Sequence, residues 1–187
     1  MPLQRSAPRE PHRAGVTGAG GQDGCVLVGR MRADGREVHA LLRDGLGRDI
    51  QWLDLSRLAG PGSLVLHVPD ITDRGAFERL VASVRQDELH NLAGLNSVSA
   101  SLEDPSTTHR TNADAVQDLL EVIGTVSRET RFYQRSSTAM FGAPQGTSVT
   151  HDADSPFMAQ CPYPAAKAAA RLAGNANRQP TGLGLCA

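Results

Sequence analysis

Apolar and polar segments alternate along the chain in the rhythm of β-strands separated by α-helices. Short apolar segments predict strands at 14–17, 37–42, 64–68, 89–92 and 131–134. Longer segments predict helices at 25–33, 72–85 and 111–126, and a further helix that reaches about residue 175. This repeated alternation predicts an α/β fold, a Rossmann-like doubly wound parallel sheet.

The chain of 187 residues is long enough for one full-sized hydrophobic core, so a single domain is expected. Residues 1–12 carry charges and prolines without an apolar run, which predicts a disordered leader and not a secretory signal. Residues 13–187 are then expected to form one Rossmann-type domain. Within it, the segment 45–62 predicts a loop that contains a short amphipathic piece at 50–58.

Charge and cysteine content exclude several classes of partner. The net charge is −1 and the basic residues are scattered, which argues against a nucleic-acid partner. No apolar run approaches the roughly 20 residues of a membrane span, so no membrane partner is expected. The cysteines at 25, 161 and 186 form no C-x-x-C pair, which indicates neither a metal site nor a disulfide framework. A cytoplasmic location fits these features.

A glycine-rich turn follows the first predicted strand, over Thr17–Gly24. Gly18 would permit the tight turn, Gly21 would let the backbone approach a pyrophosphate, and Gly24 would allow close helix–strand packing. The spacing Gly-x-x-Gly-x-x-Gly differs from the standard dinucleotide fingerprint, and an ordinary glycine-rich loop is the other interpretation. Its position in the first β-α unit favours a cofactor-binding turn.

Two further positions fit a dinucleotide. Arg43 follows the second strand, where an arginine accommodates the 2′-phosphate of NADP, so NADP is favoured over NAD. A solvated surface arginine is the alternative. Asp70 and Ile71 follow the third strand and are expected near the adenine; a helix N-terminal carboxylate is the alternative for Asp70.

Tyr163 and Lys167 stand four residues apart, which puts them on one face of a helix. A tyrosine is a poor base at neutral pH, but a nearby ammonium stabilises the phenolate and lets it move a proton to or from a substrate hydroxyl. Ser137, at the end of the preceding strand, would hydrogen-bond the same substrate oxygen. Tyr-x-x-x-Lys also occurs by chance, and the catalytic interpretation gains from the glycine turn and the strand-end serine.

Taken together, these motifs resemble the extended short-chain dehydrogenase/reductase family and, within it, the GDP-mannose 4,6-dehydratases. The segments that carry the resemblance are Thr17–Gly24, Glu37–His39, Asp70–Asp73, Asn91–Ala93, Phe132–Gln134 and Tyr163–Lys167. It extends over roughly 13–187. Gly-Gln-Asp-Gly and Phe-Tyr-Gln point to this dehydratase and not to the nucleotide-sugar epimerases.

The resemblance implies a lyase that binds NADP and converts GDP-mannose to GDP-4-keto-6-deoxymannose. In the family, the tyrosine acts as base while hydride leaves C4, a glutamate removes the C5 proton, water leaves C6 and the hydride returns there. Ser137, Tyr163 and Lys167 match the family's catalytic positions. The implied cofactor residues are Gly18, Gly21, Gln22, Asp23, Gly24, Arg43, Asp70, Ile71, Leu92, Ala93 and Lys167. A homo-oligomer is also implied.

Four departures from the family pattern limit this expectation. One is Leu95-Asn96-Ser97, in place of the family's Gln-Ser-His after the fourth strand, which weakens polar contacts near the cofactor and sugar. Ala139 stands where the family has the elimination glutamate, which predicts an impaired dehydration step unless another carboxylate, such as Asp152 or Asp154, replaces it. Pro164 could tilt Tyr163 away from the nicotinamide. The family's C-terminal substrate lobe is expected to be largely missing, so the NADP-binding domain would be incomplete. A non-catalytic NADP-binding pseudoenzyme or fragment, and a nucleotide-sugar epimerase or reductase, are the alternatives.

Overall fold

The computed structural model describes residues 12–43, 60–142, 150–152, 154–181 and 185–186. Most of the expected leader and the amphipathic piece expected at 50–58 lie outside the described residues. Among the described helices, none combines the length and the apolar character that a membrane span requires.

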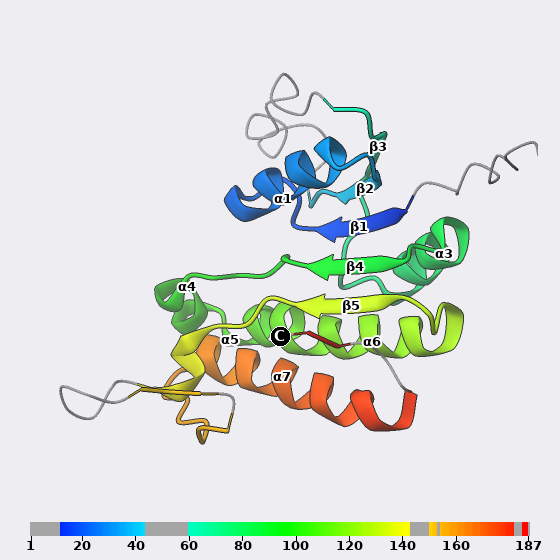
Figure 1. Cartoon of the computed structure of the whole chain (residues 1–187). Coiled ribbons are helices and arrows are strands. Elements are labelled where there is room, and N and C mark those ends of the chain that lie inside the picture. Colours follow the sequence, from blue (N-terminus) through cyan, green and yellow to red (C-terminus); the bar gives the residue numbers. More distant parts are fainter. Residues whose placement is uncertain (1–11, 44–59, 143–149, 153, 182–184, 187) are drawn as a thin grey trace, which may run out of the picture.

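The described strands form one six-stranded parallel sheet with the order β3-β2-β1-β4-β5-β6 (Figure 1). The strands are β1 (Arg13–Thr17), β2 (Glu37–Leu41), β3 (Leu64–His67), β4 (Glu88–Asn91), β5 (Arg131–Gln134) and β6 (Leu185–Cys186). The order reverses between β1 and β4, which confirms the predicted doubly wound α/β sheet.

Helices follow the strands and cover the sheet. They are α1 (Gln22–Ala33), α3 (Arg74–Val84), α4 (Val98–Glu103), α5 (Pro105–His109), α6 (Ala115–Val126) and α7 (Pro162–Thr181), with a π-helical turn η1 (Arg110–Asp114) and a 3-10 turn η2 (Thr138–Phe141). Asp73 caps α3, because its carboxylate accepts a hydrogen bond from Ala76 N at 2.9 Å.

Several helix boundaries differ from the sequence-based expectation. Helix α1 begins at Gln22 and not at Cys25, because the chain passes directly from the glycine turn into the helix at Gly21. The helix expected from Thr111 starts earlier, in continuity with α5 and the π turn. Helix α7 runs past Asn175 to Thr181. The short helices α4 and α5 were not expected, because caps and not apolar periodicity define them.

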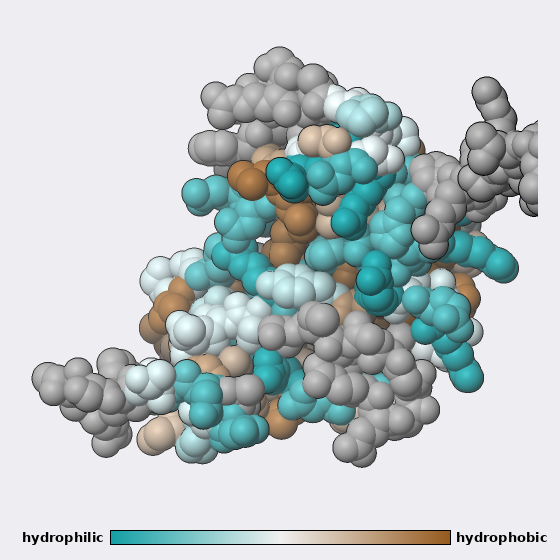
Figure 2. Space-filling view, viewed as in Figure 1, coloured by the Kyte–Doolittle hydropathy of each residue, from teal (hydrophilic) through white to brown (hydrophobic). Residues whose placement is uncertain are grey.

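The core lies on both faces of the sheet. On one face, α1 packs over alternating strand residues such as Val16, Val38 and Ala40. On the other face, α3, α6 and α7 enclose a cluster of buried hydrophobic residues that includes Phe77 and Phe132. Figure 2 shows one side of the molecule, where hydrophilic residues predominate and hydrophobic ones appear in smaller patches. The two helical layers leave the carboxyl ends of the strands as the edge where a cavity can open.

Candidate active site

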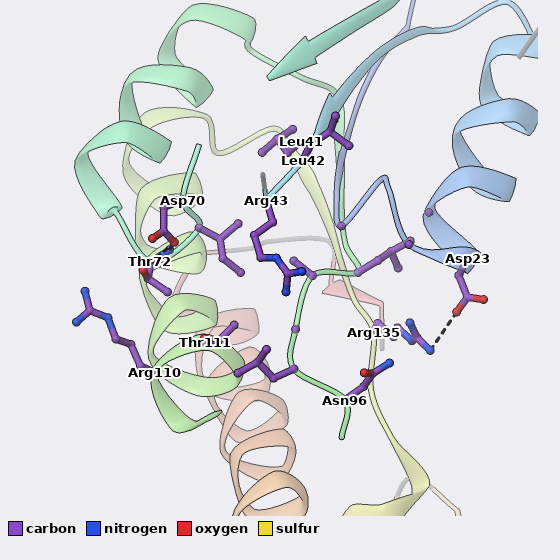
Figure 3. A pocket seen from close by; sticks show the side chains of 18 of the residues that line it. Asp23, Leu41, Leu42, Arg43, Asp70, Thr72, Asn96, Arg110, Thr111 and Arg135 are labelled. Atoms are coloured by element: carbon purple, nitrogen blue, oxygen red, sulfur yellow. Dashed lines mark hydrogen bonds and ion pairs between the residues drawn. The ribbon is translucent and has the colours of Figure 1, made fainter. Parts of the chain in front are cut away.

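A cavity of about 850 Å³ lies at the carboxyl ends of β1, β2 and β4, where the strand order reverses (Figure 3). In doubly wound folds this crevice is the usual ligand site. All of the predicted cofactor residues line it: Gly18, Gly21, Gln22, Asp23, Gly24, Arg43, Asp70, Ile71, Leu92, Ala93 and Lys167. Tyr163 also lines it, whereas Ser137 is not among its lining residues.

The glycine turn brings backbone close to backbone. Gly18 has φ of +65°, and a Cβ there would lie 2.8 Å from Ala93 N, in the loop that follows β4. A Cβ on Gly24 would lie 2.2 Å from Gly18 O. Both positions therefore exclude any side chain, and the turn can only have this shape with glycine.

The first turn of α1 faces this cavity without a side-chain cap. Gly21 is the N-cap residue and has no side chain to accept a hydrogen bond from the helix. The N–H groups at the start of a helix have no partners within it, and together with the helix dipole they favour an anion. A cavity lined by Gly21, Gln22 and Asp23 is therefore suited to a phosphate group, apart from the charge of Asp23.

The far end of the cavity combines acidic and basic groups. Asp70 accepts hydrogen bonds from Thr72 N and Thr72 Oγ1, both at 2.8 Å. These bonds, with a smaller contribution from the charge of Arg110, hold the pKa of Asp70 below its usual value, so the carboxylate is ionised at neutral pH. Arg43 and Arg110 also line this end; in Figure 3 the side chain of Arg43 lies near the middle of the view and that of Arg110 extends toward its left edge.

Tyr163 and Lys167 lie in the first turns of α7 and are buried, with 8% and 6% of their surface exposed. Burial, and secondarily the charge of Arg135, lowers the pKa of Lys167 to about 8. The ammonium form still predominates at pH 7. Pro164 lies within the first turn of α7, where proline is tolerated, and Tyr163 next to it still lines the cavity.

A row of buried polar side chains crosses the carboxyl ends of three strands. Thr17, Asn91 and Gln134 are register partners on β1, β4 and β5. Thr17 Oγ1 donates a short hydrogen bond to Asn91 Oδ1, and Asn91 Nδ2 donates to Gln134 Oε1 at 2.8 Å. The row ends at Arg135 O, which accepts from Gln134 Nε2 at 3.0 Å and from Lys167 Nζ at 3.5 Å. The network thus connects the sheet to Lys167.

The segment after β5 carries the serine and the alanine singled out in the sequence. Ser137 caps the turn η2, where its Oγ accepts a hydrogen bond from Ala139 N at 3.3 Å. Asp152 and Asp154 belong to an exposed turn closed by Asp152, and neither lines the cavity. Within the described part of the chain, no group of three or more potential metal ligands occurs.

Sequence reasoning missed three residues that shape the cavity. Asn112, 1% exposed in the π turn, holds the loop after β4 through two hydrogen bonds to the backbone of Leu95 at 2.9 and 2.7 Å. Arg110 and Arg135 line the cavity directly. The position of Arg135 immediately after a strand was the one available signal; Arg110 and Asn112 lie in an unexpected π turn.

The family model for GDP-mannose 4,6 dehydratase matches residues 16–187. The chain is 33% identical over 160 residues to a GDP-mannose 4,6-dehydratase of Vibrio cholerae, covering 83% of this chain and 42% of the relative. It is 31% identical over 186 residues to GDP-mannose 4,6 dehydratase 2 of Arabidopsis thaliana, covering 95% of this chain and 49% of that relative. The chain thus spans about half the length of these relatives.

Solved structures share the fold. The dTDP-glucose 4,6-dehydratase DesIV of Streptomyces venezuelae, with NAD and TYD bound, superposes with a TM-score of 0.77 at 25% identity, over 92% of this chain and 53% of that one. The UDP-Glc/GlcNAc 4-epimerase of Campylobacter jejuni gives a TM-score of 0.80 at 19% identity, over 91% and 50%. The second likeness supports the fold alone. From the family match and the identities to its relatives, this chain belongs to the GDP-mannose 4,6-dehydratase family.

Proposed function

We propose that this chain is the dinucleotide-binding part of a GDP-mannose 4,6-dehydratase, and that it binds NADP and acts on GDP-mannose to give GDP-4-keto-6-deoxymannose. The observation that carries the proposal is the cavity at the switch point of the sheet, which gathers the glycine turn, Tyr163 and Lys167. Its volume of about 850 Å³, its uncapped helix start and its two close-packed glycines fit a dinucleotide.

The residues of the cavity divide by chemistry. Gly18, Gly21 and Gly24, with the N–H groups of Gln22 and Asp23, would hold the pyrophosphate. Asp70 and Ile71 would contact the adenosine, and Leu92 and Ala93 would pack along the dinucleotide. Lys167 would hydrogen-bond the nicotinamide ribose.

The preference for NADP rests on Arg43. It lies at the carboxyl end of β2, on the cavity that Arg110 also lines. An arginine at this position can pair with a 2′-phosphate, whereas an acidic residue there would bind the 2′-hydroxyl of NAD. Arg110 adds a second positive charge to the same end.

When bound, the nicotinamide would supply the acceptor for the hydride that leaves C4 of the sugar. In that step Tyr163 takes the proton of the 4-hydroxyl, and the ammonium of Lys167 stabilises the negative charge on the tyrosine oxygen. Ser137 would hydrogen-bond the same hydroxyl. Ala139 supplies no group for the C5 proton, so elimination is expected to be slow by roughly 10²–10⁴-fold compared with a site that has a positioned carboxylate.

The composition of the chain independently singles out Lys167. The sequence contains 19 basic residues, and Lys167 is the only lysine among them. A chain that uses arginine at every other basic position keeps a lysine where a compact ammonium must fit a buried site beside Tyr163. A guanidinium is larger and spreads its charge over a planar group, so it suits that buried site less well than an ammonium.

The remaining sequence-based expectations stay proposals. They are a cytoplasmic location, homo-oligomeric assembly, and a Rossmann-type domain over 13–187. The near-balanced charge and the dispersed basic residues support the absence of a nucleic-acid partner.

The proposed activity is tested by incubating the purified chain with NADP and GDP-mannose and following the 4-keto sugar by mass spectrometry. Slow formation of the 4-keto product, lost in Tyr163→Phe, is the expected result. Tyr133→Phe is the matched control, because Tyr133 lies on β5 and does not line the cavity. A chain that binds the dinucleotide but forms no 4-keto sugar in any amount would instead indicate a non-catalytic binding protein.

A further inference from the structure

An ion pair crosses the crevice in which the dinucleotide is proposed to lie. Arg135, the residue after β5, places its Nη2 3.1 Å from Oδ2 of Asp23, in the first turn of α1 (Figure 3). Helix α1 begins after β1, and only β4 lies between β1 and β5. The ion pair therefore spans the carboxyl end of β4, next to the switch point between β1 and β4.

Asp23 presents an electrostatic problem at this position. Its carboxylate lines the cavity beside the uncapped start of α1, where a pyrophosphate is expected. Two like charges a few ångströms apart disfavour each other, by about 1 kcal/mol in water and by more near a protein surface. A dinucleotide can bind there readily only if a cation compensates the carboxylate.

Arg135 can contact two anions at once. A guanidinium has five N–H donors in a planar fork, and Asp23 occupies one side of it. The side chains of Arg135 and Asp23 remain 43% and 57% exposed, so the other donors are accessible from the cavity that both residues line. With the ion pair formed, the cavity still has a volume of about 850 Å³, so the pair leaves space for a ligand.

We propose that Arg135 is a further cofactor-binding residue, which donates to the pyrophosphate of the dinucleotide while it keeps its ion pair with Asp23. This inference rests on the proposed function, because it assumes a dinucleotide in this cavity. Arg135 thereby neutralises the carboxylate in the phosphate-binding turn and adds a direct contact to the phosphate.

The test measures the dissociation constants of NADP and NAD for five forms of the chain by calorimetric titration at fixed salt. They are the unchanged chain, Arg135→Gln, Asp23→Asn, the double variant, and the control Arg30→Gln. Arg30 also belongs to α1 and pairs with an aspartate, Asp34 at 3.5 Å, but it does not line the cavity. Circular dichroism verifies that each form is folded, and Arg135→Lys tests whether charge alone suffices.

We expect Arg135→Gln to weaken the binding of both dinucleotides by about 10- to 100-fold, the range for a lost hydrogen bond to a charged group. The loss should be equal for NADP and NAD, because they share the pyrophosphate. The double variant should bind at least about fivefold more tightly than Arg135→Gln, since the unpaired carboxylate of Asp23 is then removed. Arg135→Lys should fall between the unchanged chain and Arg135→Gln, and Arg30→Gln should bind as the unchanged chain does.

An effect of Arg135→Gln no larger than that of Arg30→Gln would overturn the inference. A double variant as weak as Arg135→Gln would also overturn it, because Arg135 would then not act by neutralising the carboxylate of Asp23. A loss confined to NADP would assign Arg135 to the 2′-phosphate and would also overturn it. If the folded, unchanged chain binds neither dinucleotide, the proposed function itself fails, an outcome distinct from those above.

Discussion

Gln134 and Lys167 donate hydrogen bonds to the same atom, the backbone carbonyl oxygen of Arg135, at 3.0 and 3.5 Å. Gln134 is held in turn by Asn91 on the neighbouring strand. The buried amide of Gln134 therefore fixes the carbonyl group that accepts the hydrogen bond from the Lys167 ammonium. The sheet thereby determines where that ammonium lies. In this way a residue that does not line the cavity positions one that does.

Replacing Gln134 by leucine should destabilise the chain and loosen Lys167. The substitution leaves the Asn91 amide without its acceptor inside the sheet, which costs about 1–3 kcal/mol. Urea denaturation measures this loss. Gln117→Leu is the control, because Gln117 makes one half-buried bond to Glu121 on the surface of α6 and should cost less than about 0.5 kcal/mol. Equal costs for the two variants would show that the network does not hold the site.

Lys167→Met should make the folded chain more stable at neutral pH. The pKa of Lys167 is lowered to about 8 by burial and by Arg135, so the folded state at pH 7 bears the cost of a buried ammonium. Relative to the ordinary value of 10.5, this cost amounts to at most about 3 kcal/mol.

The pH dependence of this effect has a definite sign. Between pH 8 and 10.5 the unfolded chain binds more protons at this lysine than the folded chain does, so its contribution makes stability rise with pH. Denaturation of Lys167→Met at the same pH values should lack that rise. If the two chains show the same pH dependence, the pKa of the lysine is not lowered by folding.

Acid should weaken the edge of the sheet through His67. On β3, its Nε2 lies 2.8 Å from Nδ1 of His39 on β2, and the two rings stack. Burial, and secondarily His39, lowers the pKa of His67 below its usual value of 6.5. The stability that this neutral ring contributes is present above pH 6.5 and is lost as pH falls through the lowered folded-state pKa.

Denaturation at pH 7 and at pH 5.5 tests this prediction. His67→Gln should lose less stability between the two pH values than the unchanged chain. His109→Gln, which changes an exposed histidine on α5, should keep the full loss. If His67→Gln loses as much stability in acid as the unchanged chain, the acid sensitivity comes from other groups. His90 is one such group, because its pKa is also lowered by burial.

Ala139→Glu should accelerate the formation of the 4-keto-6-deoxy sugar. The new carboxylate would stand where the family carries the acid–base group for the C5 proton, and a positioned group of this kind contributes about 10²–10⁴-fold. Ala139→Gln has the same size without the proton-accepting charge and is the control. Equal rates of product formation for the two variants would mean that the loss of the glutamate does not limit this chain.

The sheet was predictable because short strand-like segments alternate with longer helical ones, and β5 matches its predicted bounds at Arg131–Gln134. The start of α1 was not predictable, because its N-cap residue is Gly21, which has no side chain that could mark the start of a helix. Helices α4 and α5 escaped prediction because Ser97 and Asp104 begin them by capping, with little apolar periodicity.

The cavity was predictable at some positions just beyond a strand end, as at Arg43, two residues after β2, and at Asp70, three residues after β3. The cavity was not predictable where two segments that are distant in the sequence meet. Asp23 and Arg135 are 112 positions apart in the chain, and only the parallel sheet brings them within 3.1 Å. The same holds for Gln134 and Lys167, whose common partner is a backbone atom that no sequence motif reveals.

The central claim is that the cavity at the carboxyl edge of the sheet binds NADP, and calorimetric titration of the folded chain with NADP and with NAD tests it most directly. The account predicts micromolar binding of NADP, at least about tenfold tighter than NAD, with the difference lost in Arg43→Ala. Bound NADP should also protect Lys167, the sole lysine, from amine-selective modification. A folded chain that binds neither dinucleotide, and whose Lys167 reacts equally with and without NADP, would contradict it.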